Sequence, residues 1–306
     1  MGYNAACILP RVNQPTMNKS FQLGSHWRVA GVLILLMLSG CATVTSSLTA
    51  KMAGDLADSI MNSTDVETIR EGVPAYLIMI DSFLRSSPDD PDLLLAASSL
   101  NGAFSTFTTD DDARTRLLTE KSLAYALRAA CIDDTRLCDF RQLDFGAFQQ
   151  RVDNLQPRQV GVMYATGVAW TSWMQAHSDD WSAIAELAKV KYLMSRVLDL
   201  DETWALGGPH LYMGGLETIL PASMGGKPEV GRAHFERAIA IADGRYLMTK
   251  VIFAEQYAKL TFDKVLYDEL LNQVLAADPV VEGNTLTNVL AQQRAKLLLA
   301  ESDDYF

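Results

Sequence analysis

The sequence predicts an all-α protein, built as a degenerate tetratricopeptide-like helical-repeat superhelix. Helical periodicity and helix-capping residues recur along the chain, whereas alternating β-branched runs bounded by turns are nearly absent. Residues 196–201, 237–242 and 273–278 align as similar helix ends, although the strict repeat spacing is not kept. Asp90-Pro91 and Asp278-Pro279 are turn dipeptides of the kind that join such units. Helix pairs of this kind bury their apolar faces by stacking on one another.

The first element along the chain is a predicted secretory signal. The apolar run Val29–Leu38 follows Arg28 and is too short to span a bilayer, which takes about 20 apolar residues. The run ends in a motif that resembles the lipobox of bacterial lipoproteins, formed by Leu38, Ser39, Gly40 and Cys41. The resemblance implies that the Cys41 thiol carries a lipid and that the signal is cut before it.

Domain boundaries follow from this motif. We expect a signal peptide at residues 1–40, with Met17 as the alternative start, and a lipidated tether at 41–47. Residues 48–306 are then a single helical-repeat domain. Ala42 after the lipidated cysteine is typical of sorting to the outer membrane. The sequence therefore predicts a bacterial periplasmic protein that is held at the membrane by its lipid.

The helices of the domain are expected in the following order. The first two are 48–62 and 74–85, the latter with Pro74 in its first turn, and the third is 91–107, with Asp90 as its N-cap. The others are expected at 112–131, 157–177, 181–200, 208–220, 228–242, 246–260, 262–277 and 285–300, with a shorter, less regular segment at 139–154.

Composition excludes some classes of function. The chain has 26 Lys and Arg against 37 Asp and Glu, a net charge of −11. The charged residues lost with the signal are all basic, so the mature chain is more acidic still. Such an acidic chain is a poor partner for nucleic acid, because phosphate contacts need clustered basic side chains. Nucleotide-binding, metalloprotease and serine-hydrolase motifs are absent from the sequence, and the histidines have no metal-binding spacing. We expect no enzyme activity, no cofactor and no metal.

Cys131 and Cys138 are the two cysteines left beyond the signal and the lipid site. The compartment outside the cytoplasm permits disulfides, so the pair is a candidate disulfide. The alternative is two buried thiols that act as small hydrophobic side chains.

Aromatic residues in two predicted helices are candidate lining of an apolar ligand cavity, since Tyr and Trp combine broad contact with a polar tip. Trp170, Trp173 and His177 share one helix face. The candidate lining residues are Tyr164, Trp170, Trp173, His210 and Tyr212. Ordinary core packing is the alternative for all of them.

The stretch from Met163 to Phe306 resembles the T component of TRAP-transporter-associated (TatT-like) lipoproteins, where TRAP systems are tripartite and ATP-independent. The segments that carry the resemblance are 178–180, 191–194, 208–214, 220–226, 234–238, 247–251, 254–255, 274–279 and 290–295. The resemblance implies a homotrimer with an apolar pore or cleft in each protomer. It also implies association with a periplasmic TRAP-type substrate-binding protein and a small hydrophobic or organic-acid ligand. Lys250, Glu255 and Arg294 match family positions and are expected to be paired structural charges.

Two functions are consistent with these patterns. The first is a lipid-anchored periplasmic accessory component of a TRAP-type uptake system, which holds an apolar ligand or docks the substrate-binding protein. The alternative is a tetratricopeptide-like structural scaffold of the cell envelope without a small ligand. An internal apolar cavity favours the first function, and an open polar groove favours the second.

Overall fold

The computed structural model describes residues 58–306, and this part of the chain is all-helical. It contains fourteen α-helices and no strand among the described residues. The predicted signal, Met17, the lipobox Leu38 to Cys41, the tether and residues 48–57 lie outside the described residues. Within residues 58–306, every helix is too short or too polar to cross a bilayer. The all-α prediction is confirmed, and the tetratricopeptide-like repeat remains a prediction.

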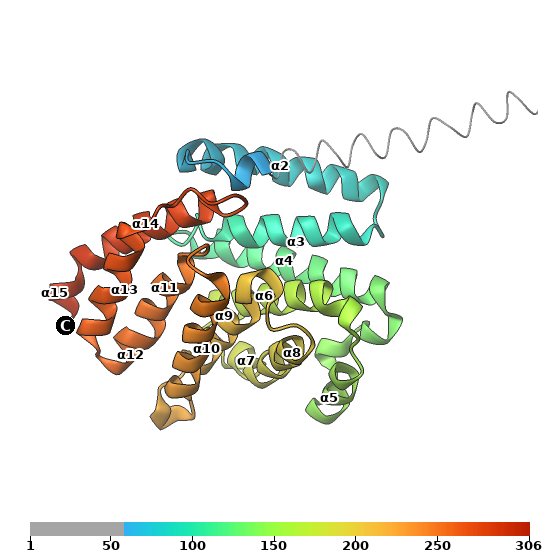
Figure 1. The fold of residues 1–306 in the computed structure, drawn as a ribbon. Coiled ribbons are helices and arrows are strands. Elements are labelled where there is room, and N and C mark those ends of the chain that lie inside the picture. The colour runs from blue at the N-terminus through green and yellow to red at the C-terminus, as the bar shows by residue number, and fades with distance from the viewer. Residues whose placement is uncertain (1–57) are drawn as a thin grey trace, which may run out of the picture. The chain divides into compact units, whose positions relative to one another are not determined.

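Three consecutive helices form the N-terminal part, α2 (Val66–Ser86), α3 (Pro91–Ser105) and α4 (Asp112–Asp133). They pack in that order, with α2 drawn at the top of Figure 1. Asp90 caps α3 as predicted, because its carboxylate accepts the amides of Asp92 and Leu93. The predicted helix start at Pro74 is wrong. Helix α2 begins eight residues earlier, at Val66, where Asp65 caps it by accepting the Thr68 amide at 3.0 Å, and Pro74 lies inside the helix.

The middle of the chain surrounds α6 (Val160–Ala176), which contacts α3, α4, α8 and α9. The less regular segment that precedes it forms short 3-10 turns and α5 (Phe145–Asp153). The predicted helix 181–200 is two helices, α7 (Trp181–Ile184) and α8 (Leu187–Leu200).

The C-terminal part begins with α9 (Trp204–Thr218) and α10 (Pro228–Ala242), which pack closely together. The predicted helix 246–260 begins as α11 (Met248–Phe253), continues through the π-helical turn η5 (Ala254–Ala258) and ends as α12 (Lys259–Thr261). The last helices are α13 (Lys264–Ala276), α14 (Thr285–Ala300) and α15 (Ser302–Tyr305). The predicted bounds of α10 and α14 are confirmed.

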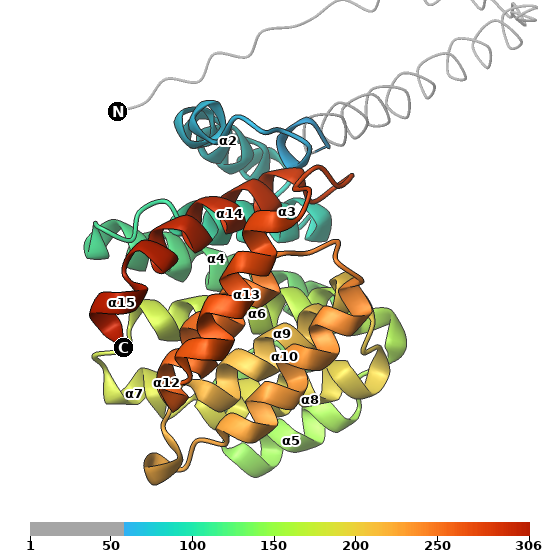
Figure 2. The same ribbon diagram turned by 60° about the vertical axis from the view of Figure 1, so that its left-hand side comes forward.

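Segments far apart in the sequence meet where α14 lies beside α2 (Figures 1 and 2). The Gly283 amide, just before α14, donates a 2.8 Å hydrogen bond to Oδ1 of Asn62, just before α2. This contact joins the start of the described part of the chain to the turn before α14.

Helix α9 lies between the two large apolar cores. Met213 and Leu216 belong to the core around α3 to α8, whereas Leu211 belongs to the core formed with α10 to α14. Side chains of α9 therefore contact both cores.

Candidate ligand site on helix α9

The first turn of α9 has an unusual backbone. Ala205, Leu206 and Gly207 have φ angles of 49°, 58° and 80°, in the left-handed region that residues with a Cβ rarely adopt. A Cβ at Gly207 would press on Ala238 and Ile241 of α10. Regular helix therefore begins at Gly208, where the sequence predicts it, and the left-handed turn sets α9 tightly against α10.

Tyr164 of α6 and Tyr212 of α9 form an aromatic pair at this turn. Their ring centroids are 5.9 Å apart at 84°, and a Cβ on Gly208 would overlap the Tyr164 hydroxyl. Both side chains stay partly accessible, yet burial raises the pKa of each phenol, as it does for the nearby Tyr246. No residue of the described part hydrogen-bonds to the two hydroxyls. The pair therefore presents two free polar groups in an enclosed aromatic setting.

Trp170 is completely buried in the core. Its ring packs edge-on against Phe140 and Phe148 at centroid distances of 6.1 and 6.0 Å. The indole N–H donates a 2.5 Å hydrogen bond to Glu186, which also accepts a two-point ion pair from Arg141. This is the core packing that the sequence left open as the alternative, and Trp170 is therefore not a lining residue of the candidate site.

Trp173 is partly buried beside the same arginine. Its ring stacks on His177 at 4.8 Å, and the Arg141 guanidinium lies 4.1 Å from the ring centroid. These contacts place the Trp173 ring against two protein groups.

His210 faces α10 and joins a chain of polar side chains. Its Nδ1 lies 2.8 Å from Nδ1 of His234, and its Nε2 lies 3.0 Å from Glu202. Hydrogen bonds from Arg237 and then His210 lower the pKa of Glu202 to about 2, while burial lowers the pKa of His234. At neutral pH His234 is uncharged. The described residues contain no cluster of three or more metal-binding side chains.

A groove lies between α7, α8 and α9, with a cavity volume of about 530 Å³. Lys191 of α8 and Glu217 of α9 meet in it, with Nζ and Oε2 at 2.6 Å. The Glu217 side chain is only 7% exposed, and its Oε2 accepts no well-oriented hydrogen bond from the described residues. The ion pair balances the charges, but the hydrogen-bonding capacity of this buried carboxylate remains unfilled.

Sequence reasoning missed both members of this pair. Glu217 is the single charged residue between Gly208 and Leu220, and that isolation was the available signal. The partner could not be identified, since Lys191 belongs to a different helix. Elsewhere, Arg294 pairs with Glu255 as expected of structural charges, whereas Lys250 donates to the neutral amide of Gln273 and forms no ion pair with a described residue.

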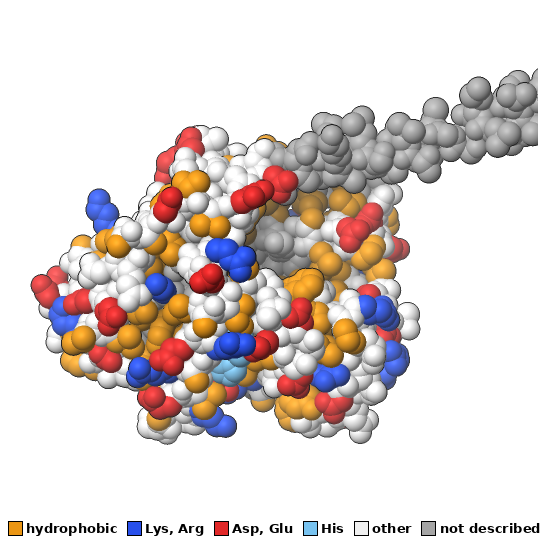
Figure 3. Space-filling view, viewed as in Figure 1, with side chains coloured by type: hydrophobic (Ala, Val, Ile, Leu, Met, Phe, Trp, Pro, Cys, Tyr) orange, Lys and Arg blue, Asp and Glu red, His pale blue; other side chains and the backbone are white. Residues whose placement is uncertain are grey.

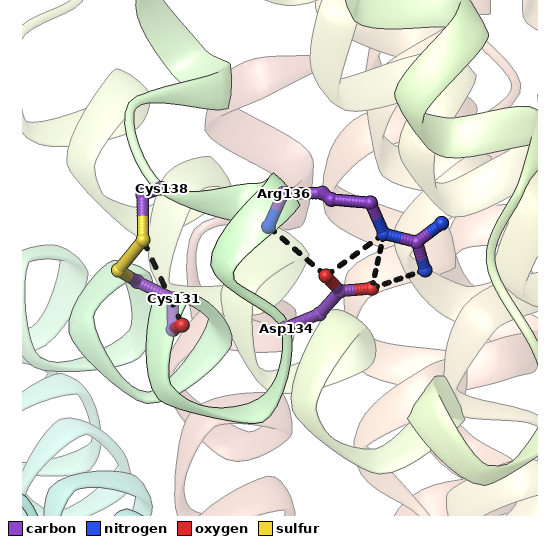
Figure 4. Close-up of a disulfide and its surroundings, with 4 residues drawn as sticks. All are labelled: Cys131, Asp134, Arg136 and Cys138. Atoms are coloured by element: carbon purple, nitrogen blue, oxygen red, sulfur yellow. Dashed lines mark hydrogen bonds and ion pairs between the residues drawn. A yellow bond between two sulfur atoms is a disulfide. The ribbon is translucent and has the colours of Figure 1, made fainter.

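Cys131 and Cys138 lie side by side where the end of α4 meets the turn η1 (Thr135–Leu137), drawn as a disulfide in Figure 4. Their Cα atoms are 4.4 Å apart, within the range that a disulfide spans. Asp134 caps the same turn through the Arg136 amide, and its pairing with the Arg136 side chain lowers the pKa of Asp134 to about 2. The oxidation state of the two cysteines remains a prediction.

Acidic, basic and hydrophobic side chains are interspersed over the face shown in Figure 3, which has no continuous basic stripe.

In architecture, the described residues form an all-helical protein in which α9 lines a groove that holds an ion pair with a buried carboxylate. A family model for the TRAP transporter T-component matches residues 62–306, so the chain belongs to this family. The family is an accessory component of a transporter, and the chain accordingly has an accessory role in a TRAP system. No curated protein matched the sequence.

Proposed function

We propose that this chain is a lipid-anchored periplasmic component of a TRAP-type uptake system, with a tetratricopeptide-like superhelix that holds an apolar ligand and docks the substrate-binding protein. Family membership supports the transport role. The lipobox supports the anchor, with Ala42 favouring the outer membrane. A tethered receptor keeps its partner at a high effective concentration near the membrane, so modest affinity is sufficient.

The observation that carries ligand binding is the Tyr164–Tyr212 pair. An enclosed aromatic pair with two unbonded hydroxyls suits a molecule that is largely apolar and bears a hydrogen-bonding group. Gly207 and Gly208 hold this wall in place, because neither has a side chain to separate α9 from its neighbours.

Ligand binding is tested on the full chain isolated from membranes in detergent. Mass spectrometry of extracted lipids and small molecules identifies what the protein retains, and a fluorescent long-chain fatty acid serves as the probe. Tyr212→Ala is expected to weaken probe binding roughly tenfold, the order of an aromatic pair contribution. Tyr305→Ala is the control, since Tyr305 is an exposed tyrosine at the C-terminus. Equal probe affinity in both variants would remove the tyrosine pair from the site.

Docking is tested with the substrate-binding protein encoded next to this chain. We expect the full chain to sediment as a homotrimer and to bind this carrier at micromolar Kd or tighter, roughly −8 kcal/mol. A monomer that binds neither carrier nor probe would instead favour the envelope scaffold.

A further inference from the structure

The groove between α8 and α9 is distinct from the tyrosine pair. Gly208 and Tyr212 form one stripe of α9 and face Tyr164, whereas Met213 and Glu217 form the neighbouring stripe and face α8. The groove is about 530 Å³ in volume, within the range of small-molecule sites.

The groove is lined mainly by apolar side chains, and its charges are confined to one place. The aliphatic and thioether side chains are joined by two hydroxyl-bearing residues, and the uncharged lining residues are Ile184, Ala185, Leu187, Ala188, Tyr192, Ser195 and Met213. The Lys191–Glu217 ion pair lies among them. Glu217 is buried and Lys191 is partly buried, and such an ion pair carries a desolvation cost that good hydrogen bonding must offset.

The hydrogen bonding of this pair is incomplete. Oε2 of Glu217 lies 2.6 Å from Lys191 Nζ without hydrogen-bond geometry, and no other donor of the described residues reaches that oxygen. Lys191 likewise makes no hydrogen bond to a described residue, so its ammonium has donors to spare. Buried carboxylate oxygens in native structures are nearly always hydrogen-bonded, so the Glu217 carboxylate has room for a further donor beside its ion pair with Lys191.

The charges of Lys191 and Glu217 determine which charged groups a ligand must carry. Lys191 and Glu217 carry opposite charges, so the pair is net neutral. His234 lies within electrostatic reach of both residues, and burial lowers the pKa of its imidazole. A simple carboxylate could bond Lys191 but would meet the charge of Glu217, and a simple amine would meet that of Lys191. A molecule with adjacent ammonium and carboxylate groups satisfies both.

We infer that this groove binds a zwitterionic α-amino acid with an aliphatic side chain. Its carboxylate accepts from Lys191, its ammonium donates to Glu217, and its side chain contacts Leu187 and Met213. The inference goes beyond the proposed function, since it requires neither the tyrosine pair nor a carrier protein.

The test is calorimetric titration of the full chain in detergent with three probes of similar size. These are L-leucine, 4-methylpentanoate, which lacks the ammonium group, and 3-methylbutylamine, which lacks the carboxylate. L-leucine is expected to bind at least about tenfold more tightly than either, as loss of a charge-assisted hydrogen bond predicts. No binding of L-leucine, or equal binding of either analogue, would overturn the inference.

Variants locate the binding. Lys191→Met and Glu217→Gln are each expected to weaken L-leucine binding about tenfold or more. The double variant K191M/E217M guards against misfolding, because removing both charges leaves no unpaired ion. It should stay folded and lose L-leucine binding.

The matched control is R128M/D89N, which removes an exposed ion pair elsewhere and should bind L-leucine normally. Unchanged binding in K191M/E217M would overturn the site. Fatty-acid binding by the same variant reports separately on the proposed function.

Discussion

The Nδ1 atoms of His210 and His234 lie 2.8 Å apart, so one of the two rings must donate a proton that the other accepts. Protonation of both rings would abolish this hydrogen bond and place two cations in contact. Burial, followed by the charge of His210 and that of Lys191, lowers the pKa of His234, while Glu217 opposes the shift. The pair is thus built for the neutral state of His234.

Stability is therefore expected to fall on acidification. The unfolded chain takes up a proton at His234 near the ordinary pKa of 6.5, whereas the folded chain does so only at lower pH. The free energy of unfolding should decrease from about pH 6.5 downward, until the pH passes the folded pKa. Urea unfolding at a series of pH values measures this decrease, which should be smaller in His234→Gln. An identical pH dependence in both proteins would contradict the assignment.

Trp170 is expected to be a stability determinant. Trp170→Ala should reduce the free energy of unfolding by about 3–5 kcal/mol, because it empties a core position and removes the indole donor to Glu186. Trp181→Ala is the matched control, since Trp181 is 76% exposed, and its change should stay within about 0.5 kcal/mol. Denaturant titration of both variants makes the comparison, and similar losses would refute the core role.

Cys131 and Cys138 are expected to be bridged in the exported protein. Thiol counting on denatured, unreduced chain should find neither of them free. Closing so short a loop stabilises by about 2–3 kcal/mol, and C131S/C138S should lose that amount. Two reactive thiols assigned to these positions by peptide mapping would show that the pair is reduced.

Cys41 is expected to carry the lipid anchor. Cys41→Ala should abolish metabolic labelling with palmitate, because Cys41 is the single cysteine of the lipobox motif. Cys7→Ala is the control and should label normally, since Cys7 precedes the apolar run. Persistent labelling of Cys41→Ala would disprove the lipoprotein assignment.

The fold could be predicted from local signals wherever those signals acted alone. Pro228 opens α10 and the Asp90-Pro91 dipeptide opens α3, because caps and first-turn prolines operate within a few residues. Pro74 misled the prediction, since Asp65 offered an earlier cap and buried Val66 anchors the added turns. Local signals cannot rank two competing starts when tertiary burial decides between them.

The site could be predicted less completely. Tyr164 and Tyr212 are predicted as cavity lining because tyrosine combines broad contact with a polar tip, and the structure brings the two rings together. The Lys191–Glu217 pair depends on how α8 docks on α9, and that geometry has no local sequence signal. Trp170 and Trp173 looked equivalent in sequence, yet only the packing of Phe140 and Phe148 distinguishes them.

The π-helical turn at residues 254–258 gives this helix one residue more than a regular α-helix needs for the same contacts. Deleting one residue there would restore regular α-helical bonding and leave the residues on either side of the turn facing the same neighbours. Lys259 would keep its ammonium over the rings of Tyr267 and Tyr305. A related chain that lacks this residue would therefore keep both its helix and these contacts, so sequences aligned across this point must allow a one-residue gap.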